Sequence, residues 1–266
     1  MLKKIFEQKF MKNVLNVLLY YLVIIPVSLL PFPLLYGLSN LLFIVFYYIS
    51  GYRKKVVIQN IRNSFPEKSG KEHLEITKRF YKHFCDLIVE SVKTFTISEK
   101  QVLKRFVCIN PEVSDKYYEQ KRSILFAGGH YNNWELFAVG FDKYVKHKTV
   151  GIYTPLSNKY FDAKMQQTRS RFGLQMISTK SVKRFLDNHL DTLTGTIFGI
   201  DQSPSNPKSA YWMTFLNQET GTVEFSGKVE WGCSCSNVFD GRSRKSLTIQ
   251  YKIPVVIGEI NLPVVR

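Results

Sequence analysis

Two residues with the chemistry for acid–base catalysis, His130 and Glu135, lie close together in the sequence. Histidine can act as a general base because its unperturbed pKa lies near neutrality, and a neighbouring carboxylate can fix its tautomer. The sequence lacks the G-x-S-x-G pattern that supplies a serine nucleophile. A His–acid pair without its own nucleophile suits activation of a substrate hydroxyl that attacks an ester or thioester. A histidine that only caps or packs a turn would show the same spacing.

The turn that must position this pair lies between a predicted strand and a predicted helix. Residues 124–127 are apolar and read as a buried strand, after which Gly128 and Gly129 allow a close approach of the backbone. The helix that follows can be capped by Asn132 or Asn133. The histidine and the carboxylate can meet only if the chain breaks before this helix begins. Unpaired N–H groups at the turn could then hold a negative oxygen.

The sequence offers little support for a metal or a cofactor. Neither the zinc-protease pattern H-E-x-x-H nor the phosphate-binding pattern G-x-x-x-x-G-K-[ST] is present. Cys85 and Cys108 stand alone in apolar surroundings and are predicted to be core residues. Cys233 and Cys235 form a pair, but no second Cys or His pair stands near them. We therefore expect no metal and no cofactor.

Apolar strands and helical segments alternate from about residue 123 onward. This order predicts an α/β fold with a mainly parallel central sheet flanked by helices. The predicted strands are residues 123–127, 149–153, 174–177, 196–200 and 254–259, and the predicted helices are residues 133–145, 158–172 and 180–188. His130 and Asp201 both follow such strands, and chemistry in parallel sheets gathers at the carboxyl ends of the strands.

The N-terminal part of the chain has the composition of a membrane anchor. Residues 13–52 contain no charged side chain, and prolines divide them into apolar pieces at about 14–30 and 34–50. Lysines precede this run and basic residues follow it, which would place both ends on the cytoplasmic side. We expect a hairpin or re-entrant anchor, with one tilted span plus an interfacial helix, or a buried helical pair in a soluble protein, as alternatives.

The predicted domain organisation follows from this composition. Residues 1–52 are expected to form the N-terminal helical anchor, and residues 53–266 the remaining domain. Within it, residues 69–95 have the apolar spacing of one long amphipathic helix, with His73 and His83 expected at its surface.

The chain is strongly basic, with 37 Lys and Arg against 21 Asp and Glu and a formal net charge of +16. Such a balance suits a negatively charged partner, which could be nucleic acid, an anionic membrane surface or an acidic protein. The basic residues are scattered among apolar helices, and no nucleic-acid-binding motif is present. We therefore expect a membrane or an acidic protein as partner, and no nucleic acid.

Several motifs, in order, resemble the lipid A biosynthesis acyltransferases of the lysophospholipid acyltransferase superfamily. G-G-H-Y-N-N-W-E-L (residues 128–136) is similar to their signature, an H-x-x-x-x-[DE] motif with asparagine and Trp-Glu in this arrangement. Further blocks are similar in the same order: V-V-I-Q-N-I-R-N-S-F-P-E (residues 56–67), R-S-R-F-G (169–173), F-G-I-D-Q-S-P (198–204) and W-M-T-F-L-N-Q-E-T (212–220). The resemblance covers about residues 12–220 and resumes at residues 251–261.

The resemblance implies transfer of an acyl chain from acyl carrier protein, or a similar thioester, to a hydroxyl of a membrane lipid, expected to be a lipid A precursor. It places the reaction at the cytoplasmic face of the bacterial inner membrane, without a metal. It implies His130 as the base and Glu135 as its partner. The substrate-binding residues that it implies are Gly129, Asn133, Arg169, Arg171, Asp201 and Gln202. Arg169 or Arg171 would hold a phosphate or the oxyanion, and Asp201 would shape the acceptor site.

Two alternatives remain open for the function. The acceptor could be a glycerophospholipid or an aminoacyl lipid, although the D-Q block argues mildly against a glycerol phosphate. The chain could also be a non-catalytic protein whose basic face binds an anionic membrane surface.

The chain departs from the family pattern after Thr220. Residues 222–247 are rich in Gly and Ser and show no helical period, and the sequence stops at Arg266, short of where family members usually end. A natural insertion or a locally shifted reading frame would produce this abrupt change in composition. Either would leave the packing of the strands after Asp201 in doubt.

Overall fold

The computed structural model describes residues 2–188, 192–204, 206–223, 229–232, 249–251 and 255–258. The chain forms two compact units. The first, here called the sheet unit, comprises Met1–Tyr20, Ile97–Asp201 and Phe225–Arg266, and the second, the helical unit, comprises Tyr21–Thr96 and Gln202–Glu224. The predicted boundary between an anchor (1–52) and the remaining domain (53–266) stays a prediction, because these units reflect packing and not membrane contact.

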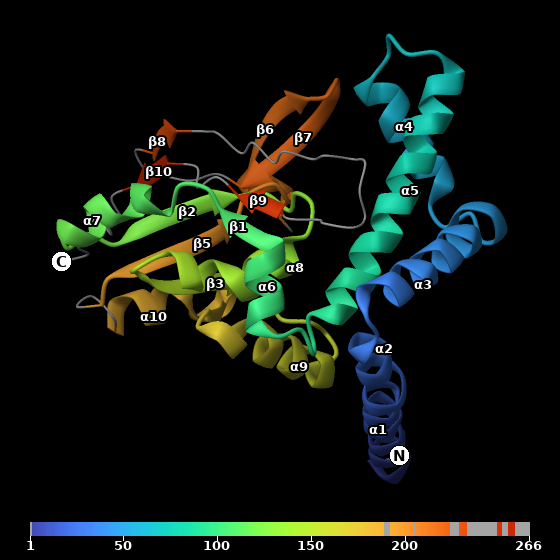
Figure 1. The fold of residues 1–266 in the computed structure, drawn as a ribbon, viewed down its shortest axis with the longest axis horizontal. Coiled ribbons are helices and arrows are strands. Elements are labelled where there is room, and N and C mark those ends of the chain that lie inside the picture. The colour runs from blue at the N-terminus through green and yellow to red at the C-terminus, as the bar shows by residue number, and fades with distance from the viewer. Residues whose placement is uncertain are drawn as a thin grey trace. The chain divides into compact units, whose positions relative to one another are not determined.

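A parallel sheet of four strands forms the centre of the sheet unit (Figure 1). Its strands, in spatial order, are β2 (Ile124–Gly128), β5 (Thr194–Gly199), β3 (Lys148–Tyr153) and β4 (Gln175–Ser178). All three pairings are parallel, so the predicted α/β fold class is confirmed. The predicted strands match these four within about two residues, since each is a short apolar run bounded by turn residues.

Helices connect the strands in the alternating order that the sequence predicted. The connecting helices are α8 (Trp134–Gly140), α9 (Lys159–Arg169) and α10 (Val182–Asn188). The first two are shorter than predicted because each ends in a 3-10 turn, at Phe141–Tyr144 and Ser170–Phe172. The helices before the sheet are α6 (Glu99–Arg105) and α7 (Asp115–Glu119), and α1 (Leu2–Leu19) also belongs to this unit.

Short strands from the C-terminal region complete the sheet unit. The strand β9 (Ile249–Tyr251) pairs in parallel with β1 (Phe106–Cys108). The strand β10 (Val255–Gly258) matches the prediction at 254–259, and among the described residues it pairs antiparallel with β8 (Val229–Gly232) in a separate two-stranded sheet. Most of the atypical stretch 222–247, with Cys233 and Cys235, lies outside the described residues.

The core of the sheet unit is aromatic and aliphatic. Phe126 from β2 and Val150 from β3 are buried, and Phe141 packs edge-on against Phe126, with ring centroids 4.9 Å apart. Cys108 is also buried, as predicted, and burial raises the pKa of its thiol to about 11. Buried side chains of this core thus come from the strands and from the helices that flank them, including Val102 of α6 and Phe185 of α10.

The helical unit consists of packed helices and one β-hairpin. Its elements are the π-helical turn η1 (Tyr20–Ile24), α2 (Ile25–Leu29), α3 (Phe32–Ile44), the π-helical turn η2 (Val45–Ile49), α4 (Lys54–Ser64), α5 (Gly70–Lys93), β6 (Ala210–Phe215) and β7 (Gln218–Val223). The predicted amphipathic helix at 69–95 corresponds to α5, which begins with a capping box between Ser69 and Glu72. Cys85, on this helix, is buried as predicted.

The predicted surface position of His73 is wrong. Its side chain is only 8% exposed, and Nε2 lies 2.8 Å from the carbonyl oxygen of Phe65. This contact joins the start of α5 to the loop that follows α4, and a backbone carbonyl holds the ring in place. The charged residues around His73 in the sequence had suggested an exposed side chain.

Two segments are long and apolar enough to cross a membrane by length and composition. They are Phe10–Leu29 and Phe32–Ile49. Both fall within the predicted anchor. In the first segment, most of the large apolar side chains are exposed. Composition alone does not distinguish a spanning helix from one that lies along a membrane surface.

Gly173, before β4, occupies a position that other residues cannot take without strain. Its φ is +128°, and a Cβ atom there would overlap the carboxylate of Asp142. That carboxylate accepts a hydrogen bond from the hydroxyl of Thr149 on β3, at 2.5 Å, so it is not free to move aside. Gly173 therefore fixes how the chain enters the sheet.

We predict that Gly173→Ala lowers the stability of the fold. Backbone strain and the overlap with Asp142 together should cost about 2 kcal/mol or more, and the melting temperature should fall by about 4–8 °C. Gly70→Ala is the matched control, because no atom lies within 4 Å of the added Cβ. Thermal unfolding of the detergent-solubilised variants checks this, and equal melting temperatures for both would contradict it.

Candidate active site

The corner between β2 and α8 has the break that the sequence required. After Gly128 the chain turns, and Asn132 adopts a left-handed conformation with φ of +54°. Asn133 is the residue that caps α8, since its side-chain oxygen accepts a hydrogen bond from the N–H of Leu136 at 3.0 Å. Asn133 is itself buried. The sequence left open whether Asn132 or Asn133 caps the helix. Asn132 lies in the left-handed turn, and Asn133 directly precedes the helix and caps it.

His130 is held at this corner by Asp201. The carboxylate accepts the backbone N–H of His130 at one oxygen, at 2.6 Å, and contacts Nδ1 of the ring with the other, at 2.8 Å. Both side chains are partly open to solvent, at 35% for the histidine and 41% for the aspartate. The two-point contact fixes both the backbone and the ring of His130.

The register of the sheet explains why these two residues meet. The strands β2 and β5 are neighbours, and Gly128 lies opposite Gly199. His130 and Asp201 each follow two residues later, so both leave the same edge of the sheet side by side. A backbone hydrogen bond of 2.9 Å from the N–H of Ile200 to the carbonyl of Gly128 extends the pairing to the corner.

Two glycines make room for this contact. A Cβ atom at Gly129 would lie 3.3 Å from the side chain of Asp201, and one at Gly199 would lie 3.0 Å from Cε1 of His130. Distances this short require the neighbour to shift. Gly129 therefore leaves space for the carboxylate, and the contact with substrate that the resemblance implied for it stays a prediction. Gly199 was not recognised from the sequence.

The contact with Asp201 determines which ring nitrogen can accept a proton. The hydrogen-bond network assigns the proton of neutral His130 to Nδ1, which donates to the carboxylate. Within the described part of the chain no group hydrogen-bonds to Nε2, which is left as the acceptor. Trp134 packs edge-on beside the ring, with centroids 5.4 Å apart. This arrangement is suited to general-base catalysis by Nε2.

Glu135 makes a different contact from the one predicted. Its two oxygens accept hydrogen bonds from Nε and Nη2 of Arg169, at 2.9 and 2.6 Å. The pair is largely buried, with side chains 7% exposed for the glutamate and 22% for the arginine. Burial alone would lower the pKa of Arg169, but the hydrogen bonds and the charge of Glu135 outweigh it and raise that pKa. The carboxylate at Nδ1 of His130 is thus that of Asp201 and not that of Glu135.

The remaining predicted residues lie in varied surroundings. Nη2 of Arg171 donates to the carbonyl of Ile97 at 2.6 Å, and its guanidinium lies 4.6 Å from the ring centre of Phe172. Burial lowers the pKa of Arg171. Gln202 is exposed. The structure therefore brings His130 together with Asp201, next to Gly129. It also brings Glu135 together with Arg169. Arg171 instead donates to a backbone carbonyl in the chain before α6.

The backbone N–H groups predicted to hold an oxyanion are partly occupied. The N–H of His130 donates to Asp201, and the N–H of Tyr131 donates to the carbonyl of Gly129 at 2.8 Å. A negative oxygen at this corner would therefore rely on other donors. A sequence signal for the true pairing did exist, since Gly-x-His at 128–130 and Gly-x-Asp at 199–201 have the same spacing after their strands.

We predict that Arg169→Met destabilises the protein by about 3–5 kcal/mol, because it leaves the carboxylate of Glu135 buried without a partner. The double variant Glu135→Gln, Arg169→Met should recover part of this loss. Denaturant unfolding measures both. Removal of the exposed pair between Arg79 and Glu75 is the control and should have little effect. A double variant that is less stable than Arg169→Met would contradict the structural role of the pair.

Comparison with known proteins gives the same family as the motifs. A sequence model of the family described as bacterial lipid A biosynthesis acyltransferase matches residues 4–222. The chain is also similar to the lipid A biosynthesis lauroyltransferase of Escherichia coli (strain K12), at 25% identity over 154 residues, which are 58% of this chain and 50% of that protein. The matched region thus spans about half the length of that relative. Since the family match covers most of the chain, including the corner with His130 and Asp201, this chain belongs to the bacterial lipid A biosynthesis acyltransferase family.

Proposed function

We propose that the protein transfers a fatty acyl chain from acyl carrier protein, or a similar thioester, to a hydroxyl of a lipid A precursor. The observation that carries the proposal is the contact between His130 and Asp201, which leaves Nε2 of the histidine as a proton acceptor at a solvent-accessible corner. The family supplies the reaction class, since its members are lipid A acyltransferases. The donor and the acceptor are the parts that the proposal adds.

The proposed reaction needs one residue to move a proton twice. Nε2 of His130 takes the proton of the acceptor hydroxyl as its oxygen bonds to the thioester carbonyl carbon. The tetrahedral intermediate then collapses, the C–S bond breaks, and the imidazolium returns the proton to the leaving thiolate. The products are an ester and a free thiol, so no metal or redox cofactor is needed to balance the step. This follows the usual logic of base catalysis without an enzyme nucleophile.

The two carboxylates then have separate tasks. Asp201 orients the ring and stabilises the imidazolium that forms during the reaction. Glu135 holds Arg169 by a bidentate contact in which Nε and Nη2 are the donors. The guanidinium has five N–H donors, so others remain for the oxyanion or for a phosphate of the acceptor. Glu135 would thus act through Arg169, which differs from the role that the motif implied.

The charge of the chain supports both proposed substrates. An acyl carrier protein is acidic and a lipid A precursor carries phosphates, so a net charge of +16 attracts both. The apolar segments Phe10–Leu29 and Phe32–Ile49 support attachment to a membrane. Together with the basic residues at both ends of the uncharged stretch, they favour the cytoplasmic face of the bacterial inner membrane.

We predict that His130→Ala abolishes acyl transfer and that Asp201→Asn lowers kcat by about 10²- to 10⁴-fold. The aspartate variant keeps the shape of the corner but loses the charge that fixes the tautomer and stabilises the imidazolium. The assay measures transfer of a radiolabelled acyl chain from acyl carrier protein to a lipid A precursor in mixed micelles. Donors of several chain lengths are compared.

Asp115→Asn is the matched control, because Asp115 also forms a partly exposed ion pair, at 2.9 Å with Lys146. It should keep full activity. Melting temperatures of all variants separate loss of chemistry from loss of fold. Transfer at the wild-type rate by folded His130→Ala would show that this histidine is not the base. Transfer only to a glycerophospholipid would keep the base and exclude the proposed acceptor.

A further inference from the structure

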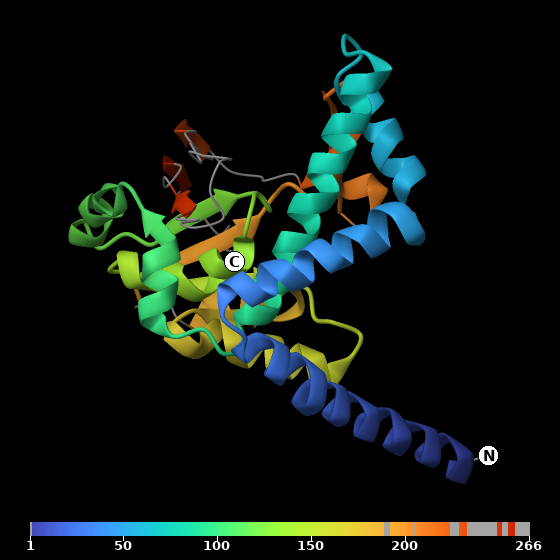
Figure 2. The ribbon, with the colours of Figure 1, turned by 45° about the vertical axis from the view of Figure 1, so that its right-hand side comes forward.

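The second apolar segment, Phe32–Ile49, packs along α5 for its full length. The contacts run antiparallel. At one end, Leu30, before α3, contacts Lys93 at the end of α5. At the other, the carbonyl of Tyr52 accepts a hydrogen bond from the hydroxyl of Tyr81. Between these ends, the hydroxyl of Tyr36 donates to Glu90 at 2.8 Å, and that of Ser39 donates to Asp86 at 2.5 Å. In Figure 2, α3 crosses in front of α5, with which it is in contact. An apolar cluster fills the rest of the contact, with Phe43, Tyr47, Tyr81 and Cys85 at its centre.

The break between α2 and α3 is closed by a charged residue of α5. Nζ of Lys93 donates to the carbonyls of Ser28 and Leu30, both at 2.9 Å, and lies 5.6 Å from the ring centre of Phe32. The hydroxyl of Thr96 also donates to the carbonyl of Ser28, at 2.6 Å. Carbonyls at the helix break therefore accept hydrogen bonds from the last residue of α5 and from the chain that follows it.

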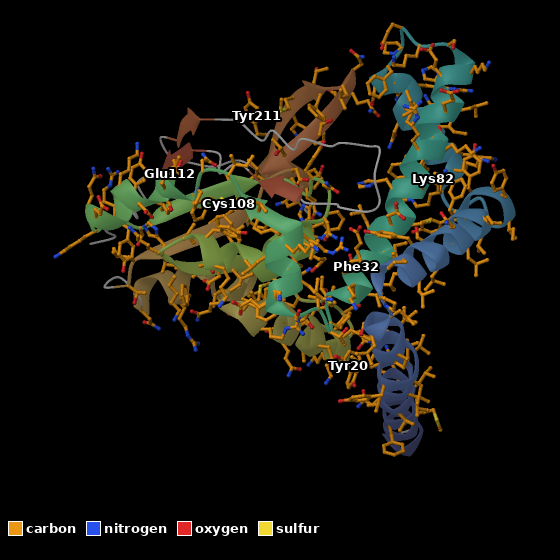
Figure 3. The ribbon with its side chains drawn as sticks, in the orientation of Figure 1. Tyr20, Phe32, Lys82, Cys108, Glu112 and Tyr211 are labelled. Atoms are coloured by element: carbon orange, nitrogen blue, oxygen red, sulfur yellow. The ribbon has the colours of Figure 1, made fainter. Side chains whose placement is uncertain are left out.

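This packing sets a condition on any span by Phe32–Ile49. If that segment crossed a bilayer, the half of α5 beside it would have to cross as well. That half carries Lys82, Asp86, Glu90 and Lys93, and Figure 3 labels Lys82 on α5 and Phe32 at the start of α3. Charged side chains at membrane depth are costly. Among the described helices, α5 does not meet the length and composition of a span.

The face of α3 that points away from α5 is apolar. Leu34 and Leu41 are 58% and 56% exposed, and because they lie seven residues apart on α3 they share one side of the helix. Tyr48, in the π-helical turn η2 that follows, is 60% exposed. Arg53 and Lys55, both exposed, follow directly. An exposed apolar stripe next to basic residues, with aromatic rings near its end, matches the chemistry of an anionic bilayer surface.

We infer that Phe32–Ile49 lies in the plane of an anionic phospholipid bilayer, with its stripe of Leu34, Leu41 and Tyr48 among the lipids and α5 on the aqueous side. The segment therefore does not cross the membrane, and the chain has no two-span hairpin. The inference does not rest on the proposed reaction, and its test needs no catalytic activity.

Spin labels at the three stripe positions test the inference. Leu34→Cys, Leu41→Cys and Tyr48→Cys are each made in the full chain, with Cys233 and Cys235 replaced by serine. Cys85 and Cys108 are buried and remain in place. The protein is placed in vesicles of phosphatidylcholine and phosphatidylglycerol. Collision rates with oxygen, which enters lipid, and with a nickel chelate, which stays in water, give the depth of each label.

A helix in the membrane plane places all three labels at one shallow depth, within about 10 Å of the headgroups. A spanning helix instead separates Leu34 and Tyr48 by about 20 Å in depth, at a rise of about 1.5 Å per residue. A graded series with Leu41 deepest would therefore overturn the inference. Labels shielded from both reagents would also overturn it, because they would show a face buried against a second copy of the chain.

A label at Leu74→Cys is the matched control, since Leu74 is an equally exposed leucine, at 51%, on the part of α5 that lies beyond α3. This label should collide with the nickel chelate and not with lipid-dissolved oxygen. Insertion of the Leu74 label to the same depth as the stripe would show that the helical unit enters lipid by another face, and would likewise overturn the inference.

Discussion

The parallel pairing of β2 with β5 is the constraint on which the candidate site depends. With Gly128 opposite Gly199, the residues two positions further along each strand leave the sheet together, and these are His130 and Asp201. The contact then uses both oxygens of the carboxylate, one on the backbone and one on the ring. A slip of one residue in this pairing would turn the side chains to opposite faces of the sheet. The orientation of the His130 ring is thus a property of strand register more than of the turn itself.

The two charged pairs at the corner differ in burial. The pair of His130 with Asp201 is partly open to solvent, so protons can exchange with water there. The pair of Glu135 with Arg169 is largely buried and bidentate. Neutralising one of the two charges would leave the other buried without a partner, which is costly. The first geometry suits a group that must change protonation state during a reaction, and the second suits a rigid support that presents positive charge.

The same distinction between composition and packing applies to the apolar segments. Phe32–Ile49 has the hydropathy of a membrane span, but polar contacts from Tyr36 and Ser39 tie it to carboxylates of α5. The hairpin of β6 and β7 shows a related pattern, because its aromatic side chains Tyr211 and Trp212 are exposed, and Figure 3 labels Tyr211 on this hairpin. Exposed apolar surface on a basic protein is consistent with work at a membrane.

The sequence by itself determined the features that depend on neighbours in the chain. These are the strand and helix periods, the presence of a capping asparagine at residue 132 or 133, the uncharged N-terminal stretch and the ordered motifs that identify the family. The partner of His130 could not be read in this way. Asp201 is 71 residues away, whereas Glu135 is much closer in the sequence, so proximity favoured Glu135 over the carboxylate that contacts the ring. Strand order and register decided between them, because hydrogen bonds between distant strands bring residues together regardless of their separation. For the same reason the buried side chain of His73, and the packing of α3 on α5, became visible only in the tertiary structure.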